Sequence, residues 1–239
     1  MNHRHMNHGV DAGEAAIGGT MSRIFVLSDG DLPVADGVLT AVGSQRLEAD
    51  RATREALREL RPGCLLLDPA FEGGRGLELM AALEKCDLRV PVLVPFADAD
   101  TEWSPRSLFL TPLRSPVCSV DELHGLLIEA VLRAAQADVG RPMFSVWDYL
   151  SLAFGSRLSA LLSLTLSTGE TLAIKLVDGE PWTFDGRAGE RPLRQLLDAA
   201  VYRVGVRPLD SAAAKRGQAR AGQTMQDLAQ HAGLGGGIA

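Results

Sequence analysis

The sequence predicts an α/β unit with a doubly wound parallel sheet, followed by a small α+β unit with an antiparallel hairpin. Short segments that are apolar throughout alternate with amphipathic segments in the first part of the chain, and such strands are typical of a parallel sheet covered on both faces. Later, apolar and polar residues alternate one by one, as in strands with one buried face. The 239 residues suffice for two domains of ordinary size.

Strands and helices alternate through the first unit. Amphipathic spacing and turn residues predict helices at 32–42, 51–60 and 76–83, and a fourth that begins at Ser119, where Glu122 completes a capping box. Apolar runs and one short edge segment predict the strands, which are residues 24–27, 46–47, 65–67, 90–94 and 108–110. This alternation is the pattern of a doubly wound α/β domain.

The second unit opens with a predicted helix at 145–154. Two alternating runs follow and are joined by Ser-Thr-Gly, so residues 161–177 predict a β-hairpin. An Asp-Gly turn leads into a third strand at 182–184, and apolar residues at helical spacing predict a helix over 189–202.

Composition shifts mark the domain boundaries and the termini. The first residues are rich in Gly, Ala, His and Asn without a period, and the last are rich in Ala, Gly and Gln with at most a weak helix at 224–231. The predicted organisation is a disordered leader at 1–20, a first domain at 21–136, a linker at 137–142, a second domain at 143–209 and a flexible tail at 210–239.

Charge distribution excludes some classes of function. Residues 21–138 carry 12 Lys and Arg against 19 Asp and Glu, whereas residues 139–209 carry 8 against 7. Binding to a phosphate backbone requires clustered Lys and Arg, and no segment contains such a cluster. We therefore expect no direct nucleic-acid partner.

Hydropathy and cysteine usage predict a cytoplasmic protein. No apolar run reaches the roughly 20 residues that a membrane-spanning helix needs, and the first 20 residues lack the apolar centre of a signal peptide. The three cysteines, Cys64, Cys86 and Cys118, are widely spaced among apolar neighbours. They are expected to be free thiols in a reducing compartment.

A single carboxylate, Asp68, ends an apolar strand, and Gly76 follows at the start of an amphipathic segment. Phosphorylation of a carboxylate needs a nucleophile at a strand end, a divalent ion held by neighbouring acids, and a cation. In a doubly wound fold these groups meet at the carboxyl edge of the sheet. An alternative interpretation is that Asp68 caps its own turn by accepting backbone N–H groups.

These features resemble the receiver domains of response regulators over residues 23–135, with Asp68 at the phosphoacceptor position and residues 76–79 matching the following helix. The resemblance implies a receiver-like, flavodoxin-like parallel sheet. Three positions depart from the family's pattern. Ser28 and Asp29 stand where receivers carry an acidic pair, Phe96 replaces the switch hydroxyl, and Thr111 stands where the fifth strand carries lysine.

The departures predict a degenerate receiver pocket. Loss of one preorganised electrostatic contact commonly costs about 3 to 4 kcal/mol of transition-state stabilisation, so losing the lysine and one acid should slow phosphorylation by several orders of magnitude. Asp31 is a second candidate metal ligand by a register slip, and Arg114 is the closest candidate to replace the lysine. We therefore favour a phosphorylation-independent pseudo-receiver.

Residues 143–209 resemble the PATAN family, small domains of bacterial signalling proteins. The likeness lies in the opening helix Val-Trp-Asp-Tyr-Leu, the hairpin, the Asp-Gly turn before an aromatic strand, and the Gly-Glu entry to the last helix. It implies a docking module for proteins. The aromatic residues of this unit are either exposed anchors for a partner or core residues; they are Trp147, Tyr149, Trp182 and Phe184.

The expected function is that of a bacterial signalling adaptor or scaffold without catalytic activity or cofactor. Its expected partners are other signalling or motility-type proteins, or a second copy of the chain. One alternative is a phosphorylatable two-component response regulator that uses Asp68 and binds Mg²⁺ through Asp29, Asp31 and Asp68. Another is a small enzyme on a flavodoxin-like fold, although the glycines near residue 74 have the wrong spacing for a phosphate-binding loop.

Overall fold

The first unit contains a five-stranded sheet in which all strands are parallel. The computed structural model describes residues 23–48, 54–96, 104–186, 193–210 and 224–231. The strand order is β2-β1-β3-β4-β5, one of the two common orders of doubly wound sheets. The strands are β1 (Ile24–Leu27), β2 (Gln45–Arg46), β3 (Cys64–Leu67), β4 (Val92–Pro95) and β5 (Leu110–Leu113).

Helices cover both faces of this sheet, as its apolar strands predicted. Alternate residues of a strand point to opposite faces, so Ile24 and Leu66 lie in one buried cluster while Phe25 and Leu65 lie in another. The helices are α2 (Asp36–Ala41), α3 (Arg54–Leu60), α4 (Phe71–Cys86) and α5 (Val120–Ala135). Helices α2 and α5 pack on the first face, and α3 and α4 on the second.

Local signals placed some boundaries well and others poorly. Ser119 caps α5 in a complete capping box with Glu122, as predicted. Helix α4 begins five residues before the expected Gly76, because a left-handed turn at residues 72–74 precedes its regular part. Strand β5 begins at Leu110 instead of residue 108, which changes the residues that reach the carboxyl edge of the sheet.

The second unit is built on a separate antiparallel sheet with the order β8-β7-β6-β9. Helix α6 (Val146–Gly155) precedes it, and the predicted hairpin forms from the first two strands. Ala160, Leu162, Leu164 and Leu166 are buried while the residues between them are partly exposed, which is the alternation expected of a one-sided sheet. The strands are β6 (Ala160–Leu166), β7 (Thr171–Val177), β8 (Glu180–Gly186) and β9 (Val201–Pro208).

The predicted helix over 189–202 is wrong. The described part of that segment is the short 3₁₀ helix η3 (Leu193–Gln195), a turn, and the start of β9. Its apolar side chains are buried as a helical face would be, including Leu196 and Val201. The end of the segment forms strand β9 because it pairs with β6, and this pairing gives the backbone N–H and C=O groups of both strands their hydrogen-bond partners.

Helix α8 (Met225–His231) lies in the segment predicted to be a flexible tail. Met225 and Leu228 are buried, and the Met225 N–H donates to a carboxylate oxygen of Glu180 at 2.9 Å. The weak helical signal at 224–231 therefore corresponds to a helix with a buried apolar side. The residues on either side of it, 211–223 and 232–239, lie outside the described part of the chain.

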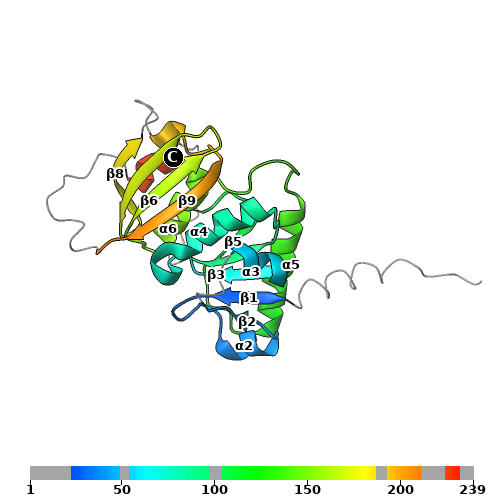
Figure 1. Cartoon of the computed structure of the whole chain (residues 1–239). Coiled ribbons are helices and arrows are strands. Elements are labelled where there is room, and N and C mark those ends of the chain that lie inside the picture. The colour runs from blue at the N-terminus through cyan, green and yellow to red at the C-terminus, as the bar shows by residue number, and fades with distance from the viewer. Residues whose placement is uncertain (1–22, 49–53, 97–103, 187–192, 211–223, 232–239) are drawn as a thin grey trace, which may run out of the picture.

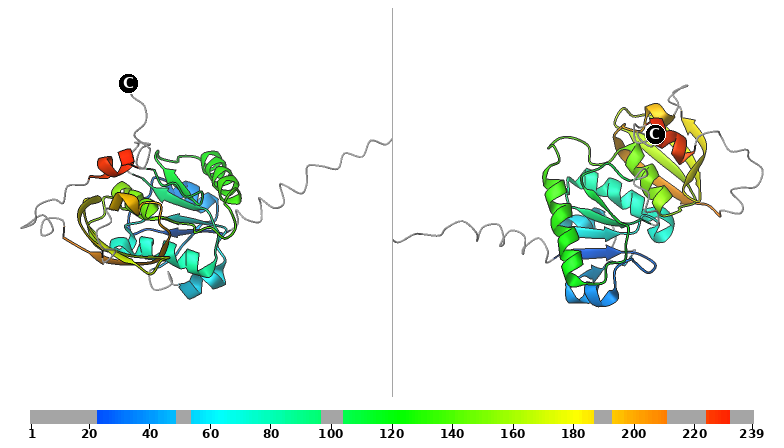
Figure 2. Two further views of the ribbon diagram at one scale, coloured as in Figure 1. Left: turned by 90° about the horizontal axis from the view of Figure 1, so that it is seen from above. Right: turned by 180° about the vertical axis from the view of Figure 1, so that it is seen from behind.

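The two units share one buried core. Helix α4 lies against β9, as two views of the chain show (Figure 1, Figure 2). The Val206 N–H on β9 donates to Glu78 Oε1 on α4 at 2.8 Å, and Gly73 and Gly74 let the backbone of α4 approach Pro208 and Val206 closely. A continuous cluster of buried side chains joins β3 and α4 to the antiparallel sheet.

Among the described helices, none is both long enough and apolar enough to cross a membrane.

Candidate functional site

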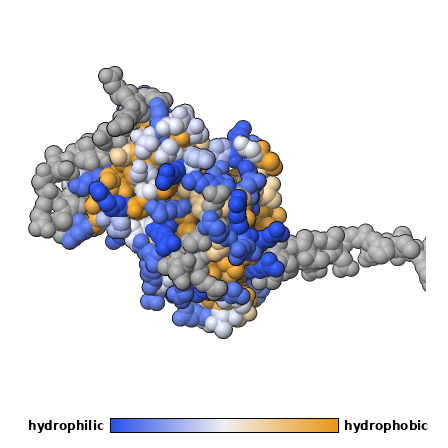
Figure 3. Space-filling view, viewed as in Figure 1, coloured by the Kyte–Doolittle hydropathy of each residue, from blue (hydrophilic) through white to orange (hydrophobic). Residues whose placement is uncertain are grey.

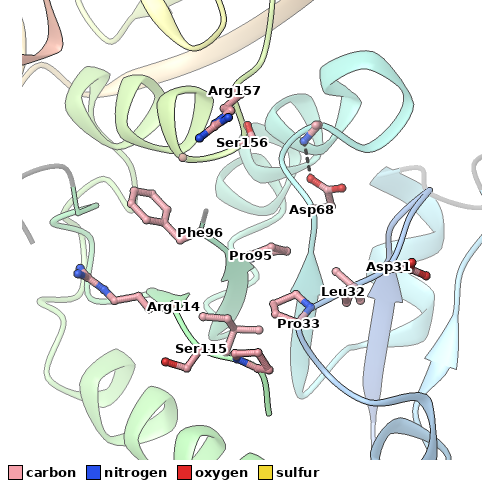
Figure 4. A pocket seen from close by; sticks show the side chains of 14 residues that line it. Asp31, Leu32, Pro33, Asp68, Pro95, Phe96, Arg114, Ser115, Ser156 and Arg157 are labelled. Atoms are coloured by element: carbon pink, nitrogen blue, oxygen red, sulfur yellow. Dashed lines mark hydrogen bonds between the residues drawn. The ribbon is translucent and has the colours of Figure 1, made fainter. Parts of the chain in front are cut away.

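A pocket of about 540 Å³ lies at the carboxyl edge of the parallel sheet, where the two units meet. Figure 4 shows its side chains, which come from the ends of four strands and of α6. Three residues, Gly155, Ser156 and Arg157, belong to the second unit. The remaining lining residues belong to the first; they are Asp31, Leu32, Pro33, Asp68, Ala70, Pro95, Phe96, Leu113, Arg114, Ser115 and Pro116.

Asp68 lies at the end of β3 and lines the pocket, as its position after the strand predicted. It is half-buried, and its Oδ1 accepts the Ala70 N–H at 2.8 Å. Burial and the negative charge of Asp29 raise the pKa of the Asp68 carboxyl, although the Ala70 hydrogen bond opposes them. Asp68 thus caps its turn, as the alternative interpretation held, and also faces the pocket.

The acidic residues after β1 have different roles. Asp29 accepts the backbone N–H of Glu72, so it connects the β1 loop to the left-handed turn that opens α4. Ser28 is buried and exchanges hydrogen bonds with the backbone of Gly30, whereas Asp31 lines the pocket. Within the described ranges no three His, Cys, Asp or Glu side chains are grouped to hold a metal ion.

Thr111, which the resemblance to receiver domains placed at the end of the fifth strand, lies inside that strand. It lies on the edge strand β5 opposite Leu93, is 4% exposed and does not line the pocket. The reason is the later start of β5, which carries the chain to Leu113 before the strand ends. The residue at the strand end is therefore Arg114, which lines the pocket.

Phe96 follows β4 and lines the pocket from a buried position, with 4% of its surface exposed. Its backbone N–H donates to Leu113 O at 3.1 Å. The ring packs against Gly155 so closely that a Cβ atom there would lie 2.4 Å from two ring carbons. The Arg114 guanidinium lies 6.0 Å from the ring centroid and donates to Ser104 Oγ.

Helix α6 is bound to the connection between β4 and β5 by polar contacts that the sequence did not predict. Trp147 Nε1 donates to Ser104 O at 2.9 Å. Asp148 Oδ1 accepts the N–H groups of Arg106 and Ser107, at 2.7 and 2.9 Å. Its Oδ2 accepts from Ser145 in a capping box. Burial raises the pKa of Asp148, against the effect of these hydrogen bonds.

The aromatic candidates for partner binding separate into two groups. Trp147 and Tyr149 are fully buried, so neither is a surface anchor, and the core-packing alternative describes both. Trp182 on β8 is half-buried. Phe184 pairs with Ile174 in the backbone register, and its side chain lies outside the described residues. The sequence left this choice open, because Asp148 and Ser151 interrupt the apolar residues of α6.

No protein-family model matches the chain, and a search of curated proteins finds no match either.

Proposed function

We propose that the protein is a signalling adaptor that acts by protein–protein interaction, with a receiver-like first unit whose conformation does not depend on phosphorylation and a PATAN-like second unit. In this proposal the chain is not an enzyme and needs no cofactor. Its partners are proteins of a signalling system or a second copy of the chain. The proposal places it in the bacterial cytoplasm.

The packing of Phe96 against Gly155 carries this proposal. In the family that the first unit resembles, a hydroxyl at this position moves toward the phosphorylated aspartate. Phe96 has no hydroxyl, and its ring packs against Gly155 of α6, where a Cβ atom would lie 2.4 Å from two ring carbons. The switch position is thus part of the core shared with the second unit. A ligand shifts a conformational equilibrium only through its differential affinity for two states, and in this proposal the packed arrangement is the populated state with or without phosphate.

Exposed apolar side chains support the docking part of the proposal. Ile128 and Leu132 stand one helical turn apart on α5 and are 39% and 58% exposed, and Val139 follows at 92%. Figure 3 shows apolar residues at the surface on the side of the molecule where α5 lies. Apolar anchors supply interface energy while acidic surroundings steer a basic partner, and the first unit has an acidic balance.

The phosphorylation-independent part is tested with beryllofluoride and Mg²⁺, which together mimic an aspartyl phosphate. We expect the amide NMR spectrum of the full chain to stay unchanged during the titration. Asp68→Asn serves as the control, because it removes the acceptor. Saturable shifts in the wild type that disappear in Asp68→Asn would contradict the proposal.

The docking part is tested by co-purification with Leu132→Asp, which places a charge in the exposed apolar group on α5. Ala41→Asp is the matched control, since it adds the same charge at an exposed position on α2. We expect Leu132→Asp alone to lose the proteins that the wild type recovers. Equal recovery by all three chains would contradict docking at α5.

One observation favours the alternative of a phosphorylatable response regulator. Asp68 faces a pocket that also contains Asp31 and a cationic side chain, Arg114. In this alternative Asp68 is the phosphoacceptor, and Asp29, Asp31 and Asp68 contact Mg²⁺. The beryllofluoride titration distinguishes the two proposals directly.

A further inference from the structure

We propose that the pocket between the two units binds a small zwitterion, an amino acid with an apolar side chain, with its carboxylate toward Arg157 and its ammonium group toward Asp68. This inference goes beyond the proposed adaptor function and does not depend on phosphotransfer.

The position of the pocket is that of a ligand site. In open α/β sheets, ligands bind outside the carboxyl ends of the strands, at the point where the strand order reverses. Here the order reverses between β1 and β3, and residues that follow both strands line the pocket, including Asp31 and Asp68. Ligand sites also favour domain junctions and volumes of roughly 300 to 1,000 Å³. The 540 Å³ pocket meets both conditions.

The charged side chains that line the pocket come from both units. Figure 4 shows Arg157 at the end of α6 and Asp68 at the end of β3, whereas Arg114 lies apart from Arg157, beyond Phe96. Arg157 belongs to the second unit and has a left-handed backbone, with φ of 52°, which is uncommon for a residue other than glycine. The pocket therefore has a cationic side chain from the second unit, Arg157, and a carboxylate from the first, Asp68.

This pair of charges selects the class of ligand. A simple anion would be attracted by Arg157 but repelled by Asp68, and a simple cation would be attracted by Asp68 but repelled by Arg157. Both forces are stronger in a pocket than at an open surface, because water is partly excluded there. A zwitterion satisfies both side chains. Arginine suits the carboxylate, since its planar guanidinium matches that group.

The rest of the lining is suited to an apolar side chain. Leu32, Pro33, Phe96 and Leu113 also line the pocket. Apolar walls with a few convergent polar groups are typical of small-molecule sites. A ligand in this position would contact Asp68 of the first unit and Arg157 of the second, and so bridge them.

The test is isothermal titration calorimetry of the full chain with L-leucine and L-phenylalanine. Isocaproate and isoamylamine are the matched probes, because each is leucine without one of its two charged groups. We expect saturable binding of at least one amino acid, and binding at least about tenfold weaker for each single-charge probe, which corresponds to about 1.4 kcal/mol. If neither amino acid binds at millimolar concentration, the proposal is overturned.

Two variants assign the binding to this pocket. Asp68→Asn and Arg157→Asn should each weaken amino-acid binding by about tenfold or more, and Asn tolerates the left-handed backbone at position 157. Arg203→Ala, at an exposed position on β9, should leave it unchanged. Circular dichroism checks that each variant is folded. Binding that survives both pocket variants, or isocaproate binding as tight as that of leucine, would refute a zwitterion site here.

Discussion

The carboxylate of Asp148 accepts the backbone N–H of Ser107 at 2.9 Å, across a separation of 41 residues in the chain. The acceptor lies in the first turn of α6, and the donor lies in the connection that leads into β5. Asp148 is buried, so the contact is made without competition from water. It joins the second unit to the connection that leads into β5.

The first prediction concerns this contact. Asp148→Ala should lower the free energy of unfolding by about 3 kcal/mol, because it leaves the buried N–H groups of Arg106 and Ser107 without their acceptor. Urea denaturation followed by circular dichroism measures the loss. The matched control is Asp198→Ala, which removes an 84% exposed partner of Arg106 and should cost about 1 kcal/mol or less. Equal losses in the two variants would argue against the structural role of Asp148.

The second prediction concerns the packing of α6 on Phe96. Gly155→Ala should cost about 1 to 3 kcal/mol, because the added Cβ would overlap the ring. Phe96→Leu should reduce that cost, so the double variant should be more stable than the sum of the single effects. Gly125→Ala is the control. It stands in α5 with no atom within 4 Å of the added Cβ, and alanine should stabilise that helix by up to about 1 kcal/mol.

The third prediction follows from the pKa of Asp68. Burial raises that pKa above its ordinary value of 3.8, so the folded chain binds the proton more tightly than the unfolded chain does. The wild type therefore loses stability as the pH rises from 3.8 through the folded pKa. Asp68→Asn cannot ionise and escapes this loss.

We expect Asp68→Asn to be more stable than the wild type near about pH 7, by less than about 1 kcal/mol. The difference should shrink as the pH falls through the folded pKa and below 3.8, where the wild-type carboxyl becomes protonated in both states. Urea denaturation at several pH values measures it. A variant that is less stable than the wild type at neutral pH would show that the charged form of Asp68 stabilises the fold.

The fourth prediction concerns the contact between α4 and β9. Gly74→Ala should cost about 2 to 4 kcal/mol, because the residue has φ of 110° and the added Cβ would lie 2.5 Å from Val206 Cγ1. Gly169→Ala is the matched control, with φ of 86° and no atom within 4 Å. It should show the backbone cost alone, about 1 kcal/mol. Thermal unfolding compares the two, and similar losses would mean that the close approach to β9 contributes little.

Local patterns predicted much of the fold and the position of its acidic centre. The α/β alternation, the apolar strands β1, β3 and β4, the cap of α5 at Ser119 and the β6–β7 hairpin all follow from side-chain periodicity and turn chemistry within a few residues. The position of Asp68 at a strand end was predicted in the same way, because the apolar run of β3 ends directly before it.

Only the tertiary structure decided the features that depend on distant residues. The segment 189–202 has a helical apolar spacing, yet its end pairs with β6 in β9, because strand pairing satisfies the backbone of both strands. The start of β5, two residues later than predicted, brings Arg114 to the pocket in place of Thr111. Trp147 and Tyr149 are buried because α6 packs between two sheets, and a periodicity read along one segment contains no information about which other segments will cover it.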